Sequence, residues 1–289
     1  MNYRHAYHAG NFADCMKHAL LVALLRAVQE KPAPIFVLDT HAGLGSYDLS
    51  DAPARRTGEH RDGIDRLRAD PPAELADYVG LVGQIAAERA MQPQGEPAFG
   101  HAAHYPGSPA LIRALLREHD RLACCELHPE DAAVLRRHFA RDRQVAVHRR
   151  DGWQAVRALL PPAGLSRGLV LIDPPFESGE DYARIVAAMA DARARFAGGV
   201  VAAWYPIKHR APVHALHLDI RAAGVARVIA AELWLRPPLD PARLNGCGLL
   251  IAGAPWGFEA VAEPILTALV ARLATEAGAG HSMLRITSP

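Results

Sequence analysis

Short apolar runs alternate with segments of helical periodicity along most of the chain, and this alternation constrains the fold more than any other feature. The clearest runs cover residues 35–40, 122–127, 145–147, 168–172, 200–206, 227–235 and 248–254. Runs without polar alternation are typical of strands buried on both faces of a parallel sheet. The pattern predicts an α/β fold with a doubly wound, mostly parallel sheet of seven strands. A short connection between the last two strands predicts one antiparallel edge strand, and a short tail, 283–287, ends the chain.

The length and composition fit one large domain with an insertion. The chain has 289 residues, of which 50% are hydrophobic, so it can bury a sizeable core. No apolar run approaches the ~20 residues that cross a bilayer, and the N-terminus lacks the apolar stretch of a signal peptide. We therefore expect a cytoplasmic protein with no membrane partner. No apolar surface stripe stands out, so we expect a monomer without an obligate protein partner.

The cysteines and the charge distribution bound the possible sites. Cys15, Cys124, Cys125 and Cys247 form no CxxC pair, so we expect buried, reduced thiols and no metal. The net charge of +1 neither favours nor excludes nucleic acid. Six arginines nevertheless gather between Arg136 and Arg150, with one acid among them. Such a cluster can bind phosphates or can be a solvated helix face, and the sequence leaves both interpretations open.

Two segments stand apart from the alternating pattern. A helix is predicted over 14–30, with Asp14 as its N-cap and Lys31-Pro32 as its end. The distance from the first strand to the second is far longer than the ~20 residues usual between the glycines and the ribose-binding acid of a nucleotide-binding unit. Mixed-charge, helix-like pieces fill this interval. We therefore predict a main domain of residues 1–49 and 105–289, with a small helical subdomain inserted at 50–104.

The fourth long run, Gly168 to Ile172, ends in Asp173-Pro174-Pro175-Phe176. Ligand-handling residues of α/β proteins lie just beyond the carboxyl ends of strands. The Asp173 side chain and the Pro174 carbonyl can each accept one N–H, while the Phe176 ring can stack on a flat base. This is the Asp/Asn-Pro-Pro-aromatic pattern of enzymes that methylate exocyclic amino groups. A strand end followed by a proline-capped loop would produce the same four residues, so the motif does not decide alone.

Three further candidate ligand-binding positions lie at the ends of earlier predicted strands. Gly43-x-Gly45 comes directly after the first strand, and glycines there let the backbone approach a ligand. Glu126 ends the second strand and can accept two ribose hydroxyls at once. Asp151 follows the third strand. This order resembles that of a class I S-adenosylmethionine-dependent methyltransferase, which implies a Rossmann-like fold and this methyl donor.

The resemblance narrows to the RlmJ family. It rests on motifs spread over nearly the whole chain: Tyr3-Arg4-His5, His8-Ala9-Gly10-Asn11, Asp14…Lys17-His18, Leu38 to Gly43, Arg56-Thr57-Gly58-Glu59, Tyr105 to Pro109, Glu126-Leu127-His128-Pro129, Asp151-Gly152 and Trp204-Tyr205-Pro206. The family methylates the N6 of an adenine in bacterial 23S ribosomal RNA, and the resemblance implies adenine 2030. It therefore also implies 23S RNA as the partner.

The resemblance also implies roles for particular residues. Asp173, Pro174 and Phe176 would be catalytic. The residues that would contact S-adenosylmethionine are His18, His41, Gly43, Ser108, Glu126, Asp151, Gly152 and Asp173. Those that would contact the RNA are Tyr3, Arg4, His5 and Lys17. Taken singly, structural explanations exist: His18 can cap its helix, His41 can be a core imidazole, Ser108 can be an N-cap and Tyr3 can pack under the sheet.

Phe176 departs from the tyrosine that the family usually has. Its ring keeps the stacking face and loses only a hydroxyl, so we expect activity to survive. Three rival functions remain open. A methyltransferase acting on DNA adenine or protein glutamine uses the same amine chemistry, and an RNA-binding module could keep the sheet without catalysis. A nicotinamide oxidoreductase is disfavoured because the third glycine of the dinucleotide fingerprint is absent.

Overall fold

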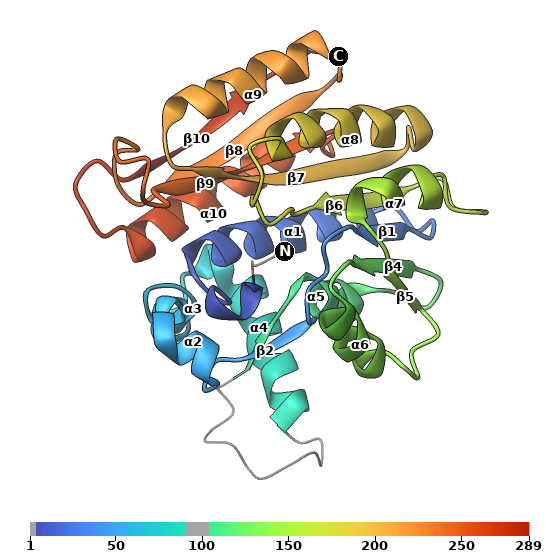
Figure 1. Cartoon of the computed structure of the whole chain (residues 1–289), viewed down its shortest axis with the longest axis horizontal. Helices are drawn as coiled ribbons and strands as arrows, with labels where there is room; N and C mark the ends of the chain where they lie inside the picture. Colours follow the sequence, from blue (N-terminus) through green and yellow to red (C-terminus); the bar gives the residue numbers. More distant parts are fainter. Residues whose placement is uncertain (1–3, 91–103, 289) are drawn as a thin grey trace.

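Eight strands form one central sheet in the computed structural model, which describes residues 4–90 and 104–288 (Figure 1). In order across the sheet they are β10 (Gly280–Arg285), β8 (Val228–Trp234), β9 (Gly246–Ala252), β7 (Gly199–Ile207), β6 (Gly168–Ile172), β1 (Phe36–Asp39), β4 (Arg121–Glu126) and β5 (Val145–Arg149). The five strands from β7 to β5 run parallel. The α/β class with a mostly parallel sheet is therefore confirmed.

Two details of the predicted sheet were wrong. β9 is antiparallel to both of its neighbours, β7 and β8, so this antiparallel strand is interior and all its residues are buried. The antiparallel strand at the edge is β10, which pairs with β8 and raises the strand number from seven to eight. Its sequence, Gly-His-Ser-Met-Leu-Arg, has no apolar run because the strand is half exposed, and the periodicity therefore gave no signal.

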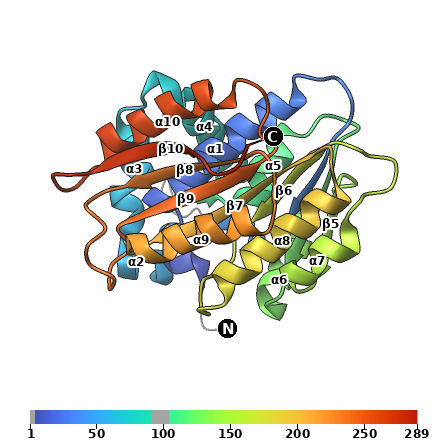
Figure 2. The ribbon, with the colours of Figure 1, turned by 90° about the horizontal axis from the view of Figure 1, so that it is seen from above.

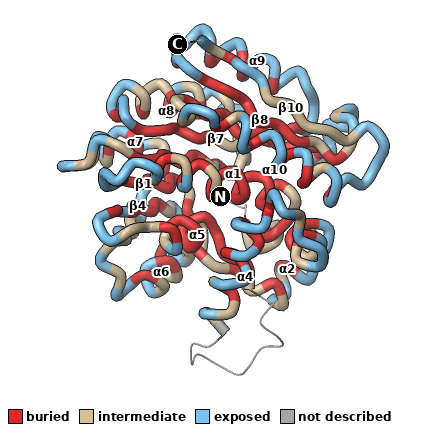
Figure 3. Tube along the Cα trace, turned by 180° about the vertical axis from the view of Figure 1, so that it is seen from behind, coloured by how far each residue is buried: buried red, intermediate tan, exposed pale blue. Residues whose placement is uncertain are grey.

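Helices cover both faces of the sheet (Figure 2). The first core lies under α1 (Phe12–Gln29), α5 (Ser108–Leu115), α6 (Pro129–His138) and α10 (Phe258–Leu273). The second lies under α7 (Gly152–Leu159), α8 (Asp181–Arg195) and α9 (Arg210–Ala222). Because each face is covered, the central strands are buried along most of their length (Figure 3). This is the arrangement that leaves strand ends as the place for a ligand.

α1 begins two residues earlier than predicted. Its N-cap is Asn11, whose side chain accepts a hydrogen bond of 3.0 Å from the backbone N of Asp14. The prediction that Asp14 is the N-cap was therefore wrong. Asp14 lies in the first turn, buried with 2% of its surface exposed. A short 3-10 helix, η1 (His5–Tyr7), precedes α1.

The segment between β1 and β4 is mostly helical. A two-stranded antiparallel ribbon of β2 (Ser46–Asp48) and β3 (His104–Pro106) flanks it. The described part between them contains α2 (Ala52–Thr57), η2 (Glu59–Asp62), α3 (Ile64–Ala69), η3 (Ala73–Leu75) and α4 (Ala76–Ala90). Its buried apolar residues belong to the same core as α1 and α10. We keep the division into a main domain and an inserted subdomain as a proposal.

Among the described residues, no helix is long and apolar enough to cross a membrane.

Candidate active site

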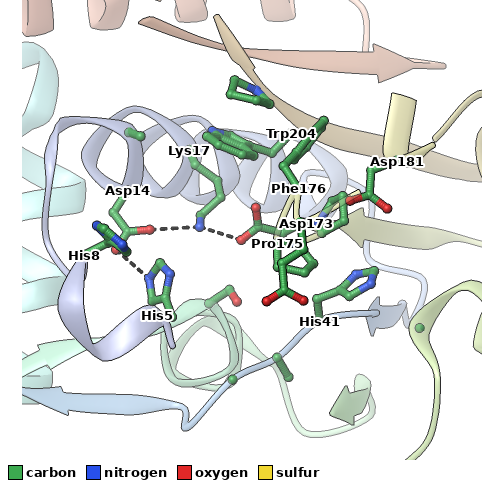
Figure 4. Close-up of a pocket in the computed structure, with 18 of the residues that line it drawn as sticks. His5, His8, Asp14, Lys17, His41, Asp173, Pro175, Phe176, Asp181 and Trp204 are labelled. Carbon is green, nitrogen blue, oxygen red and sulfur yellow. Dashed lines mark hydrogen bonds and ion pairs between the residues drawn. The ribbon is translucent and has the colours of Figure 1, made fainter. Parts of the chain in front are cut away.

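A cavity of about 720 Å³ opens at the carboxyl ends of the central strands, beside the first turns of α1 (Figure 4). The residues after β1, β4, β5 and β6 contribute to its wall because parallel strands bring their carboxyl ends to one edge. Twelve predicted site residues line it: His5, Lys17, His18, His41, Gly43, Ser108, Glu126, Asp151, Gly152, Asp173, Pro174 and Phe176. Arg4 lies outside this lining, and Tyr3 lies outside the described residues.

A buried charge network occupies the end of the cavity near β6. The Lys17 Nζ donates to Asp173 Oδ2 at 2.5 Å and to Asp14 Oδ1 at 2.8 Å (Figure 4). Burial would lower the pKa of Lys17, but these two carboxylates hold it well above its ordinary value. Burial would likewise raise the pKa of Asp14, yet His5 and Lys17 hold it well below. Lys17 therefore fixes the orientation of Asp173 with a full positive charge.

Phe176 forms an aromatic wall next to Asp173. Its ring lies edge-on to Trp204, with 5.6 Å between ring centroids, and edge-on to Tyr182 at 5.0 Å. Its backbone has φ of +51°, a left-handed conformation that non-glycine residues rarely adopt. Such strain persists where the surrounding structure over-determines a residue, and it gathers at functional sites. The packing of Trp204 and Tyr182 thus holds the Phe176 ring beside the carboxylate.

The opposite end of the cavity is built on Glu126. Its Oε2 accepts from the backbone N of Gly43 at 2.9 Å, and its Oε1 accepts from that of His128 at 2.7 Å. Gly43 has φ of +59°, which favours glycine. Burial raises the pKa of Glu126. The two amides orient the carboxylate toward the cavity, and each oxygen retains a second lone pair for a ligand.

Asp151 is the N-cap of α7. Its Oδ1 accepts from the backbone N of Trp153 at 2.8 Å and of Gln154 at 3.3 Å, so the capping bonds leave Oδ2 uninvolved. The next residue must be glycine for a packing reason. A Cβ at Gly152 would lie 2.1 Å from the Thr40 carbonyl oxygen. Gly152 therefore allows the start of α7 to approach the end of β1.

The prediction that Ser108 is the N-cap of α5 was wrong, because the N-cap is Gly107. The Ser108 hydroxyl donates to Asp39 Oδ2 at 2.7 Å. Asp39 is fully buried, its Oδ1 has no partner in the part of the chain that the structure describes, and burial raises its pKa to about 7. An unpartnered buried carboxylate oxygen is costly. It is the kind of group that a cationic ligand nearby would stabilise.

Two histidines line the cavity, His18 fully buried and His41 partly buried. His18 Nδ1 lies 2.7 Å from the Tyr105 hydroxyl, and the two rings stack at 5.6 Å. His41 Nδ1 lies 2.8 Å from Thr40 Oγ1, and its ring meets Trp153 edge-on at 5.1 Å. Burial lowers the pKa of His18 to about 3 and that of His41 to about 4. Both rings are therefore neutral at neutral pH.

The N-terminal segment reaches across to α6. Arg4 forms ion pairs with Glu130 at 2.9 Å and with Asp131 at 2.7 Å, which places its guanidinium on the helix and not in the cavity. His5 turns inward, with its Nε2 2.9 Å from Asp14 Oδ2. The predicted RNA-contacting residues therefore do not all lie in the cavity. His5 and Lys17 line it, Arg4 anchors the segment beside it, and Tyr3 lies outside the described residues.

Comparison with known proteins decides the family. The family model described as "Ribosomal RNA large subunit methyltransferase D, RlmJ" matches residues 32–286. The chain belongs to the RlmJ family. A relative from Escherichia coli K12 named "Ribosomal RNA large subunit methyltransferase J" is 38% identical, and the match covers 98% of this chain and 97% of the relative. A relative of the same name from Haemophilus influenzae is 36% identical, and that match covers 96% of this chain and 95% of the relative. A crystal structure of a Legionella pneumophila protein has a TM-score of 0.83 and 32% identity, and covers 96% of this chain and 98% of its own.

Membership of the RlmJ family confirms the predictions of a methyltransferase and of an enzyme. Sequence reasoning missed the parts of this RlmJ site that depend on tertiary contacts. Asp39 was predicted only as a motif residue, and Asp14 only as a helix cap and a motif residue. The spacing of Asp14 and Lys17, three apart on one helix, was the available signal for their ion pair. In residues 4–90 and 104–288, no group of three or more His, Cys, Asp or Glu could hold a metal ion.

The neutral His18 of this RlmJ chain makes stability depend on pH. The pKa of the ring is 6.5 in an unfolded chain and about 3 in the fold. The contribution of the neutral ring to the free energy of unfolding is therefore complete above pH 6.5 and is lost as pH falls toward 3. We expect the free energy of unfolding of the parent protein to fall by about 2 kcal/mol more than that of His18→Gln between pH 6.5 and 5. Urea denaturation at both pH values measures this, and equal decreases would contradict it.

Proposed function

We propose that this chain transfers a methyl group from S-adenosylmethionine to the exocyclic N6 of an adenine in 23S ribosomal RNA, which produces N6-methyladenine and S-adenosylhomocysteine. The observation that carries the proposal is that Asp173, Pro174 and Phe176 share one cavity with Glu126 and Asp151. The first three residues suit an amino group on a flat base, and the other two suit a nucleoside. The names of the two curated relatives support RNA of the large ribosomal subunit as the substrate.

The residues present fit the methyl donor. Glu126 offers lone pairs to both ribose hydroxyls, and Asp151 Oδ2 can accept from the adenine amine of the donor. Asp39 does not line the cavity but lies behind the cavity-lining Ser108, and its Oδ1, unpartnered among the described residues, suits a positive charge on the amino-acid part. When bound, the donor supplies a methyl group on an already activated sulfonium. The protein therefore contributes mainly by positioning the acceptor.

The acceptor is a poor nucleophile because its lone pair is delocalised into the adenine ring. Lys17 holds Oδ2 of Asp173, which leaves Oδ1 to accept one N6–H, and the Pro174 carbonyl can accept the other. These bonds favour a pyramidal nitrogen whose lone pair points at the methyl group. The proton released from N6 then passes to Asp173, directly or through water. Phe176 stacks on the base.

A base inside an RNA helix cannot reach this cavity. The target adenine must be splayed from a loop or flipped out of its stack before Asp173 can contact it.

Incubating the protein with labelled donor and separate pools of RNA, DNA and protein tests the proposal. We expect label in RNA, recovered as N6-methyladenine. Label in DNA adenine or in protein glutamine would mean that the protein methylates an amino group of another substrate, and would contradict the RNA assignment. Failure to bind the donor in calorimetry would instead favour a non-catalytic RNA-binding module.

Phe176→Tyr should leave the turnover number within about threefold, because tyrosine keeps the stacking face and the hydroxyl has no required partner in the mechanism. Phe176→Ala should lower turnover by about tenfold or more, since base stacking contributes about 1–3 kcal/mol. Single-turnover methylation of 23S RNA measures both. Equal rates for Phe176→Ala and the parent protein would show that the ring does not hold the base.

A further inference from the structure

Six exposed arginines lie on or next to β5, the edge strand of the sheet, and on the helix and loop that precede it, and we call them the β5 arginine strip. They are Arg136, Arg137, Arg141, Arg143, Arg149 and Arg150, and all six are exposed. β5 is the last strand on its side of the sheet, next to β4, with α6 packed against it (Figure 1). The strip therefore includes arginines from one helix, from one edge strand and from the loops beside that strand.

None of the six arginines makes an ion pair within the described residues, and three carboxylates nearby in the sequence are already paired with other arginines. Asp142, the one acid inside the segment, is bound by Arg113. Glu130 and Asp131, at the other end of α6, are bound by Arg4. Six like charges without counter-charges repel each other, so an external anionic partner would bind here with favourable Coulomb energy.

The arginines from different elements converge near the end of β5. Arg136 on α6 lies over the strand, with its Nε 3.5 Å from the Val147 carbonyl oxygen. Alternation along a strand puts Arg149 on the same face as Val147, which packs toward α6. Burial lowers the pKa of His148, and Arg150 and Arg136 lower it further, which is consistent with two guanidinium groups near this ring. The charge is thus densest at the carboxyl end of β5.

That end of β5 is joined directly to the cavity. Arg149 and Arg150 immediately precede Asp151, Gly152 and Trp153, all of which line it. From there the strip follows β5 back to Arg143, a distance of roughly 20 Å at about 3.3 Å per residue. A nucleic-acid backbone that leaves the cavity rim can therefore pass Arg149, Arg136 over Val147 and Arg143 in turn.

We propose that the β5 arginine strip binds the phosphate backbone of the 23S RNA that flanks the target adenine. None of the six arginines lines the cavity, and none is paired with the N-terminal segment in the described part of the chain. The proposal rests on the proposed function, because it takes the substrate to be RNA. Contacts to phosphates fix register without reading sequence, and they suit arginine because its planar fork matches the phosphate oxygens. The cavity, and not the strip, selects the adenine.

A structural role is the competing explanation, since charged residues protect edge strands from pairing with other chains. Arg136 fits that role, because it contacts the open edge of β5. Arg143 and Arg149 are better probes, because neither side chain has a hydrogen bond or ion pair with another described residue. Arg195 at the end of α8 is the matched control: it is exposed, has no ion pair in the described part of the chain, and lies near the start of β7, away from the carboxyl ends.

The test compares Arg149→Glu, Arg143→Glu and the control Arg195→Glu. Each changes the charge equally, so a general charge effect cancels. Fluorescence anisotropy with a 23S RNA fragment containing the target measures affinity at several salt concentrations, and calorimetry measures donor affinity. We expect Arg149→Glu to weaken RNA binding about tenfold and to reduce the salt slope by about one unit. Arg143→Glu should have the same direction of effect, with donor affinity and the melting temperature unchanged.

RNA affinity equal to that of Arg195→Glu for both strip variants would overturn the proposal. So would aggregation of the strip variants with unchanged RNA affinity, because that is the result of an edge-protecting role. The failure of the proposed function is recognised separately. In that case the parent protein itself transfers no methyl group to RNA, whatever the strip variants do.

Discussion

Asp173→Asn should reduce methyl transfer to adenine by about 10²-fold or more while donor binding is largely retained. The asparagine keeps the size of the side chain, but it cannot take the proton from N6, and proton transfer by a positioned group contributes about 10²–10⁴-fold. Lys17 keeps Asp14 as a buried partner at 2.8 Å, so the fold should survive. Single-turnover kinetics with 23S RNA and donor titration by calorimetry separate the two effects.

Asp191→Asn is the control for this loss. Asp191 lies on α8 outside the cavity and pairs with Arg157 at 2.6 Å on the surface, where an ion pair contributes little. Its substitution should leave methyl transfer unchanged. If Asp173→Asn also transferred methyl groups at the parent rate, Asp173 would have no chemical role, and the assignment of the Asp-Pro-Pro-Phe motif would be wrong.

Lys17→Met should be the most destabilising single change in the site. Lys17 is 4% exposed, and its ammonium neutralises two carboxylates that it contacts at 2.5 and 2.8 Å. Removing one partner of a buried ion pair typically costs about 3–5 kcal/mol, because the remaining charge is left uncompensated. Methyl transfer should fall as well, since Asp173 loses the group that orients it. Urea denaturation measures the free energy of unfolding.

The Asp14→Asn change tests whether charge is the cause. In the Lys17→Met background it should restore part of the lost stability, because it removes one uncompensated buried carboxylate. In the parent protein it should destabilise. The difference between the two effects gives the coupling free energy of the pair. A loss below about 1 kcal/mol for Lys17→Met, or additive effects of the two changes, would contradict a charge-balancing role.

The sequence predicted the parts of the site that follow from strand ends. Glu126, Asp151 and Asp173 end or follow buried runs, and parallel strands bring those ends to one edge, so their meeting in one cavity required no knowledge of side-chain packing. The ion pair between Lys17 and Asp173 joins positions 156 residues apart, and no local pattern signals such a contact. The hydrogen bond from Ser108 to Asp39 was missed for the same reason, because Asp39 lies on β1, far from Ser108 in the sequence.

The errors in the fold have a similar cause. β10 lacks an apolar run because one side of an edge strand faces solvent, and its existence depends on pairing with β8. The interior position of β9 depends on the topology, since its apolar run fits any buried strand equally well. The N-cap of α1 is Asn11 and not Asp14. Both residue types cap helices, so the sequence did not distinguish them, and the Asp14 carboxylate binds Lys17 and His5 instead.

Mapping N6-methyladenine in 23S ribosomal RNA from a strain that lacks this protein tests the central claim most directly. The account predicts that one methylated adenine disappears on deletion, returns with the parent gene, and stays absent with the Asp173→Asn variant. An unchanged set of N6-methyladenines after deletion, or full restoration by Asp173→Asn, would contradict it.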